Sequence, residues 1–112
     1  MAFYSVIIVA QQKTGVKASS LQDKVPVRAE INGSPVFIIS LAGKIYAMDG
    51  ACSHHGGPLE QGTMEDSIIT CPWHGARFDV TTAKVQEDTP WATDLHSYKA
   101  SVDQSGEVVV EL

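Results

Sequence analysis

Two stretches in the middle of this sequence decide the fold and the chemistry: residues 52–59 read CSHHGGPL, and residues 71–79 read CPWHGARFD. They hold both cysteines of the chain, and each cysteine has a histidine two or three positions later. The Gly and Pro residues around these pairs let the backbone turn tightly and approach a bound group closely. Each stretch therefore predicts a loop that offers one sulfur and one nitrogen ligand to a metal centre.

Short segments rich in β-branched residues lie on both sides of these loops, with Gly or Pro between them. Many short strands with frequent turns are typical of an all-β sandwich or barrel. Hairpin turns are expected at Asn32-Gly33-Ser34, Ala42-Gly43 and Gln104-Ser105-Gly106, and a short helical turn at Gln22–Lys24. The predicted strands are Tyr4–Val9, Pro26–Ile31, Val36–Leu41, Lys44–Met48, Ser67–Thr70, Arg77–Val80, Tyr98–Val102 and Val108–Glu111.

The bulk properties favour one small domain, 1–112. Eight basic and 13 acidic residues give a net charge of −5, which argues against nucleic acid or an anionic membrane as partner. The apolar run Val6–Ala10 is too short for a membrane span and has no basic leader. We therefore expect a cytoplasmic protein that has no membrane contact.

Three interpretations of the cysteine–histidine pairs compete. Incidental placement is improbable because two independent pairs lie in Gly/Pro loops. A structural zinc site accepts two sulfur and two nitrogen ligands, but zinc loops usually pair Cys with Cys and His with His. In the third interpretation, two imidazoles replace two thiolates on one iron of a [2Fe–2S] cluster.

The pattern C-x-H followed by C-x-x-H-G resembles the Rieske [2Fe–2S] family, and it stands here as Cys52, His54, Cys71, His74 and Gly75. The resemblance extends to Leu59, Gly62, Pro72, Trp73, Phe78 and Asp79.

The resemblance implies a Rieske cluster with Cys52 and Cys71 on the inner iron and His54 and His74 on the outer one. It also implies a base of antiparallel sheets and a cluster-binding subdomain of about residues 49–82. His55 is then expected to be an exposed loop residue, and His96 a surface or packing histidine. Leu59 and Trp73 are expected to cover the cluster, and Pro90 lies in a segment that passes over the cluster in the family.

The ligand set also predicts the redox behaviour. A cluster with two thiolates is neutral when oxidised, so its potential lies above that of all-cysteine clusters, in a range of roughly −150 to +300 mV. High-potential members of the family have a disulfide at the positions of Gly57 and Trp73, and hydroxyls at those of Ala76 and Phe78. This chain has neither, which predicts the lower part of the range.

By resemblance, a free-standing chain of this kind is an electron carrier and not itself an enzyme. The family's ferredoxin components take electrons from a flavoprotein reductase and pass them to a terminal oxygenase, so these are the expected partners of a monomer. His54 and His74 would form the exit edge. Acidic residues near the loops either steer docking or are solvated charges: Asp49, Glu60, Glu65, Asp66, Glu87 and Asp88. Two alternatives stay open, a small subunit of a nitrite-reductase-type enzyme and a zinc-stabilised interaction module.

Overall fold

The computed structural model describes residues 11–53 and 55–111. Within these ranges the regular elements are strands and two short 3₁₀ helices, η1 (Ala18–Ser20) and η2 (Leu59–Gln61), which confirms the predicted all-β class. None of the helices in the described ranges has the length and hydrophobicity needed to cross a membrane. The strands are β1 (Gln11–Lys17), β2 (Val27–Ile31), β3 (Ser34–Leu41), β4 (Lys44–Asp49), β5 (Thr63–Glu65), β6 (Ile68–Thr70), β7 (Arg77–Asp79), β8 (Lys84–Val85), β9 (Ser97–Val102) and β10 (Glu107–Glu111).

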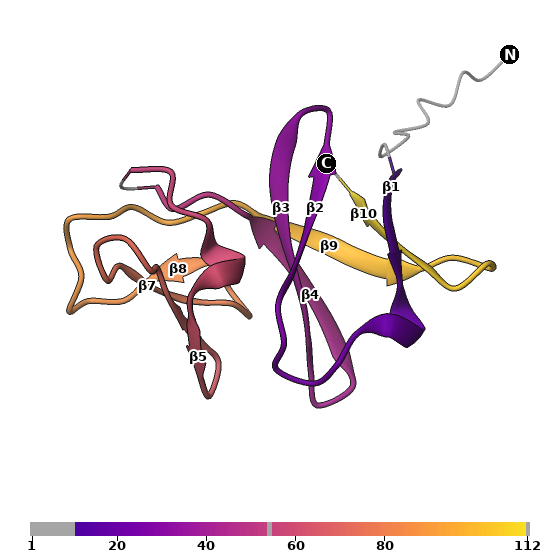
Figure 1. Cartoon of the computed structure of the whole chain (residues 1–112), viewed down its shortest axis with the longest axis horizontal. Helices are drawn as coiled ribbons and strands as arrows, with labels where there is room; N and C mark the ends of the chain where they lie inside the picture. The colour runs from indigo at the N-terminus through magenta and orange to yellow at the C-terminus, as the bar shows by residue number, and fades with distance from the viewer. Residues whose placement is uncertain (1–10, 54, 112) are drawn as a thin grey trace, which may run out of the picture.

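The strands form two antiparallel sheets (Figure 1). The larger sheet has six strands in the order β1-β10-β9-β4-β3-β2. Its edge strands β1 and β2 contact each other, so the sheet is nearly closed into a barrel. The smaller sheet has the order β5-β6-β7-β8 and lies beside the base, with the chain crossing over after β4 and returning into β9.

Two tight turns set the register of the base. Asn32 and Gly33 both have positive φ, as do Ala42 and Gly43. This is the signature of the type I′ turn, whose twist matches that of the strands it joins. The register then pairs Ile31 with Ser34 and Leu41 with Lys44, so these two predicted hairpins are confirmed, and the third joins the antiparallel strands β9 and β10.

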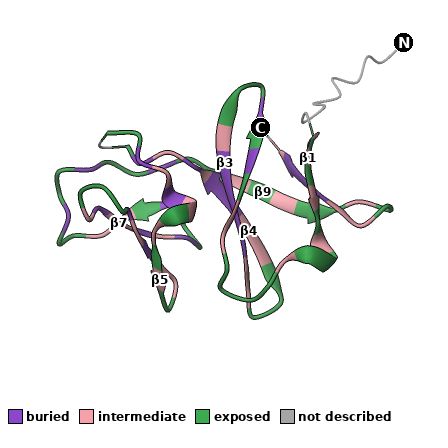
Figure 2. Ribbon diagram, viewed as in Figure 1, coloured by how far each residue is buried: buried purple, intermediate pink, exposed green. Residues whose placement is uncertain are grey.

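Strand β3 separates two hydrophobic cores because successive side chains of a strand point to opposite faces. Val36 and Ile38 lie in the core of the barrel, with Val108 and Val110. Phe37 and Ile39 lie in a second core, which extends into the smaller sheet. In Figure 2, β3 lies in the larger sheet on the side nearest the smaller sheet, and residues 36–39 of this strand are buried. The loops of the smaller sheet are therefore packed on a rigid base.

The helical turn predicted at Gln22–Lys24 is wrong. The 3₁₀ turn lies earlier, at Ala18–Ser20, and Lys24 has a left-handed φ of 64°. The Asp23 carboxylate accepts a hydrogen bond from Ala42 N (3.0 Å), and Lys24 N donates to Ser40 O (2.8 Å). These contacts with the β3–β4 hairpin, distant in sequence, override the local helical tendency.

The first predicted strand, Tyr4–Val9, lies outside the described residues. Strand β1 at Gln11–Lys17 was not predicted, because its only large apolar residue is Val16. It pairs with β10. The short strands β5 and β8 were also missed, since two or three residues carry no periodic pattern.

Candidate metal centre

The first loop joins β4 to η2 and contains Cys52. The carbonyl oxygen of Cys52 accepts a hydrogen bond from Gly56 N (2.8 Å), and Cys52 N donates to Gly57 O (2.9 Å). Gly56 has φ +74°, a left-handed conformation that glycine adopts without strain. The backbone is thereby closed into a compact turn with the cysteine at its start.

The second loop joins β6 to β7 and repeats this arrangement. Cys71 O accepts from Gly75 N (3.2 Å), and Cys71 N donates to Ala76 O (2.8 Å). Gly75 also has φ +74°. The two loops thus share the same pair of hydrogen bonds around the cysteine although one reads C-x-H and the other C-x-x-H, an equivalence that the sequence did not reveal.

The two loops meet at Gly57. A Cβ atom added there would lie 2.6 Å from Cys71 Sγ and 3.3 Å from the ring of Trp73. The thiol of the second loop therefore packs directly on the backbone of the first, and no side chain fits between them. The neighbouring positions of Gly57 and Trp73 are the two at which high-potential family members would have their disulfide.

The two kinds of side chain predicted to be ligands differ in burial. Cys52 and Cys71 are only 4% and 2% exposed, whereas His74 is exposed. The rings of His55 and His74 lie side by side with centroids 4.8 Å apart. His54 lies outside the described residues, so the structure leaves its role as a ligand a prediction.

Apolar side chains enclose the thiols from the inside. Leu59, Ala76 and Phe78 are fully buried in the core that contains both cysteines. Trp73 packs beside Gly57 but is 57% exposed. The exclusion of water expected of Leu59 and Trp73 therefore falls mainly to Leu59 and its buried neighbours. Pro90 is exposed, and its expected place over the cluster remains a prediction.

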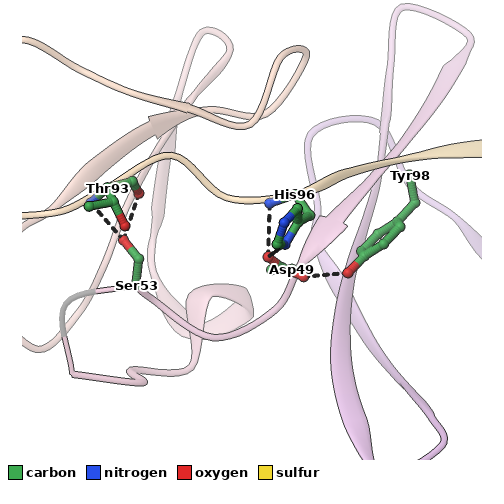
Figure 3. A network of polar contacts seen from close by, with 5 residues as sticks. All are labelled: Asp49, Ser53, Thr93, His96 and Tyr98. Carbon is green, nitrogen blue, oxygen red and sulfur yellow. Dashed lines mark hydrogen bonds and ion pairs between the residues drawn. The ribbon is translucent and has the colours of Figure 1, made fainter. Parts of the chain in front are cut away.

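Sequence reasoning missed a polar network beside the first loop, shown in Figure 3. The carboxylate of Asp49 accepts hydrogen bonds from Tyr98 Oη (2.5 Å) and from His96 N (2.8 Å). Ser53 and Thr93 form a second pair nearer the loop. The partners are 40 or more residues apart, so no local pattern signals them.

The network has an electrostatic consequence for Tyr98. Burial raises the pKa of its hydroxyl to about 12, with further contributions from the hydrogen bond to Asp49 and from the charge of that carboxylate. His96 is exposed, with Nδ1 3.1 Å from Asp49 Oδ2, which confirms the expected surface position.

These observations fit a [2Fe–2S] centre with mixed ligands. Two thiols are buried, imidazole lies on the solvent side, and the lack of a side chain at Gly57 lets Cys71 Sγ pack against the first loop. An all-β base that carries two cysteine–histidine loops defines a small iron–sulfur protein with an all-β fold. The family model of the Rieske [2Fe–2S] domain, which describes the sequences of that family, matches residues 12–99. The chain therefore belongs to the Rieske family. Its cofactor is a Rieske-type [2Fe–2S] cluster.

The relatives include short and long proteins. The ferredoxin component of the naphthalene 1,2-dioxygenase/salicylate 5-hydroxylase systems of Ralstonia sp. is 34% identical over 69% of this chain and 73% of its own length. Apoptosis-inducing factor 3 of Homo sapiens and Mus musculus is 31% identical over 67% of this chain, but the match spans only 12% of that protein.

Solved structures show the same fold. The ferredoxin of carbazole 1,9a-dioxygenase from Nocardioides aromaticivorans IC177 has a TM-score of 0.80 and 27% identity, covering 90% of this chain and 96% of its own. A chain in a complex of reduced oxygenase and oxidized ferredoxin of carbazole 1,9a-dioxygenase also scores 0.80, at 28% identity over 90% of this chain and 92% of its own. A putative nitrite reductase small subunit from Mycobacterium tuberculosis scores 0.78 at 19% identity over 94% of this chain and 96% of its own, which shows the fold alone.

Proposed function

We propose that this chain is a one-electron carrier whose Rieske cluster is held by Cys52, His54, Cys71 and His74. The observation that supports it best is the asymmetry of the site: both thiols are buried, and His74 lies at the surface. When bound, the cluster supplies a one-electron couple. The protein excludes water around the sulfur side and presents the imidazole side to a partner.

The proposed route runs from a flavoprotein reductase through this chain to a terminal oxygenase. Support for the acceptor comes from the relatives that are ferredoxin components of dioxygenase systems and from the ferredoxin neighbour bound to an oxygenase. The reductase follows from the family resemblance alone. The nitrite-reductase alternative has less support, because its structural neighbours share the fold at 15 to 19% identity.

A reductive titration tests the carrier function. The purified protein is titrated anaerobically with dithionite, and the reduced form is then mixed with an oxidised ring-hydroxylating oxygenase component. We expect one electron per chain and rapid anaerobic reoxidation by the oxygenase, which the His74→Ala variant should not show. Uptake of no electron, or of two in one step, would contradict the proposal.

We further propose that the chain is a single domain with its cluster-binding part at about residues 49–82, and that it works as a monomer in the cytoplasm. The packing of the second core against β3 supports the single domain. Sedimentation of the loaded protein tests the monomer, and fractionation of the source cells tests the location.

A further inference from the structure

The chain segments that enter and leave the cluster-binding part run side by side and are tied at two points (Figure 3). At the base end, Asp49 N donates to His96 O (3.0 Å), and His96 N donates to Asp49 Oδ2 (2.8 Å). At the loop end, Ser53 Oγ donates to Thr93 O (2.6 Å), and Thr93 N donates to Ser53 Oγ (3.0 Å).

Ser53 thus uses one hydroxyl as both donor and acceptor toward the backbone of a single residue. Alanine offers neither function, whereas threonine retains both. The position matters because Ser53 is the residue between Cys52 and His54 in the C-x-H motif. Its hydroxyl therefore connects the first cysteine loop directly to a segment 40 residues away.

We call this segment, residues 86–95, the strap. The start of the strap is fixed to β7, the strand that follows the second loop. Gln86 N donates to Arg77 O (2.8 Å), Arg77 N donates to the buried Thr89 Oγ1 (3.2 Å), and Arg77 Nη1 lies 2.8 Å from Asp88 Oδ2. The strap is consequently anchored next to both loops.

The strap also closes the core around the thiols. Ala92 and Leu95 are buried in the same cluster of side chains as Cys52 and Cys71. Ser53 and Thr93 themselves are exposed, so their hydrogen bonds compete with water. They form because the anchored strap already has little conformational freedom left to lose.

We propose that Ser53 is a positioning residue: its hydroxyl fixes the strap against the first loop and thereby fixes the surroundings of the Cys52 thiolate. This inference rests on the proposed cluster site. The hydrogen bonds between Ser53 and Thr93 belong to the chain itself, so amide exchange at Thr93 gives a readout that does not depend on electron delivery.

The experiment compares the loaded wild-type protein with Ser53→Ala, Ser53→Thr and Ser53→Val. Amide hydrogen exchange of the peptide containing Thr93 is measured by mass spectrometry, and the paramagnetic resonance spectrum is recorded on the reduced form. In Ser53→Ala we expect exchange at Thr93 to accelerate by up to about tenfold, as the loss of a typical hydrogen bond allows, together with shifted or broadened g-values. Ser53→Thr should restore both. Tyr98→Phe, which removes a bond at the base end, should lower stability and leave the g-values unchanged.

Each outcome decides the inference. Faster exchange with unchanged g-values would reduce Ser53 to a structural role and overturn it, as would exchange unchanged in Ser53→Ala. If Ser53→Ala does not bind the cluster, Ser53→Thr and Ser53→Val isolate the effect of the hydroxyl, because their side chains have the same shape. Cluster binding by the threonine variant alone supports the inference. Equal cluster content in the two variants overturns it. A wild-type protein without a [2Fe–2S] signal would contradict the proposed function instead.

Discussion

At the scale of single residues, the site depends on small side chains as much as on its ligands. Gly57 matters because the thiol of Cys71 occupies the space where a Cβ would lie. At Gly56, nothing lies within 4 Å of such an atom, and only the positive φ disfavours a side chain. The two neighbouring glycines therefore separate a steric requirement from a conformational one.

Gly57→Ala should disrupt the centre. A Cβ 2.6 Å from Cys71 Sγ forces the loops apart, at a cost of about 1–3 kcal/mol typical of overpacking. We expect iron content well below two per chain. Gly56→Ala is the matched control: it should lose about 1–2 kcal/mol of stability and still load the cluster. Equal iron in the two variants would refute the steric account.

Three single variants test which histidines bind the cluster. His54→Ala and His74→Ala should abolish the native cluster and lower stability, because metal binding is coupled to folding. His55→Ala should leave cluster content nearly unchanged. The measurement is iron and sulfide per chain with the visible spectrum.

His55 is the main alternative to His54 as a ligand. It stands three residues after Cys52, as His74 stands three residues after Cys71, and its ring lies beside that of His74. Loss of the cluster in His55→Ala with retention in His54→Ala would reverse the assignment made from the C-x-H motif.

At the scale of elements, the sequence predicts what is local. The apolar run in β3 and the turn residues Asn32-Gly33 and Ala42-Gly43 determine strands and register within a few residues of themselves. Both cysteine loops were likewise predicted, because Gly and Pro punctuate them. In contrast, the pairing of β1 with β10 and the bonds of Ser53 depend on partners 40 or more residues away.

The link between β4 and β9 yields a test with a defined pH dependence. Tyr98 has a pKa of about 12 in the fold against 10.0 ordinarily. Between these values the unfolded chain releases the proton while the folded chain keeps it, so this group's stabilisation is complete below pH 10 and is lost as the pH rises through about 12.

Tyr98→Phe should therefore be less stable than the wild type at neutral pH, by about 1 kcal/mol for one hydrogen bond, and the difference should shrink as the pH rises above 10. Denaturant unfolding of both proteins at several pH values gives this difference, in which the common titration of lysines cancels. A difference that stays constant up to about pH 12 would show that Tyr98 ionises alike in both states.

At the scale of the whole molecule, charge and potential decide which partners fit. The net charge of −5 suits a basic partner surface. Of the acidic residues expected near the loops, Asp49, Glu60 and Asp88 have partners within the fold, although Asp88 is also exposed. Glu65, Asp66 and Glu87 form a second group, which is exposed. Any steering toward a partner falls mainly to this second group.

The reduction potential should rise when a hydroxyl is introduced at one buried position of the second loop. Ala76 is fully buried in the second loop, at the position where high-potential family members have serine. Ala76→Ser should raise the midpoint, because a donor near the sulfurs stabilises the added electron; a tenfold preference for the reduced state corresponds to about 59 mV.

Ala83→Ser is the control for that shift. It adds a hydroxyl at another fully buried alanine of the same core, outside both loops, and should leave the midpoint unchanged. Equal shifts in the two variants, measured by redox titration, would show that burial of a polar group and not donation to the cluster is the cause.

The central claim is that two Cys/His loops hold a low-potential Rieske cluster, and one measurement tests it most directly. The purified protein is reduced anaerobically, its paramagnetic resonance spectrum is recorded during a redox titration, and iron, sulfide and zinc are quantified on the same sample. The account predicts about two irons per chain, a rhombic [2Fe–2S] signal with an average g below that of all-cysteine ferredoxins, and a midpoint in the lower part of the range from roughly −150 to +300 mV. A silent spectrum with one zinc per chain, or a strongly positive midpoint, would contradict it.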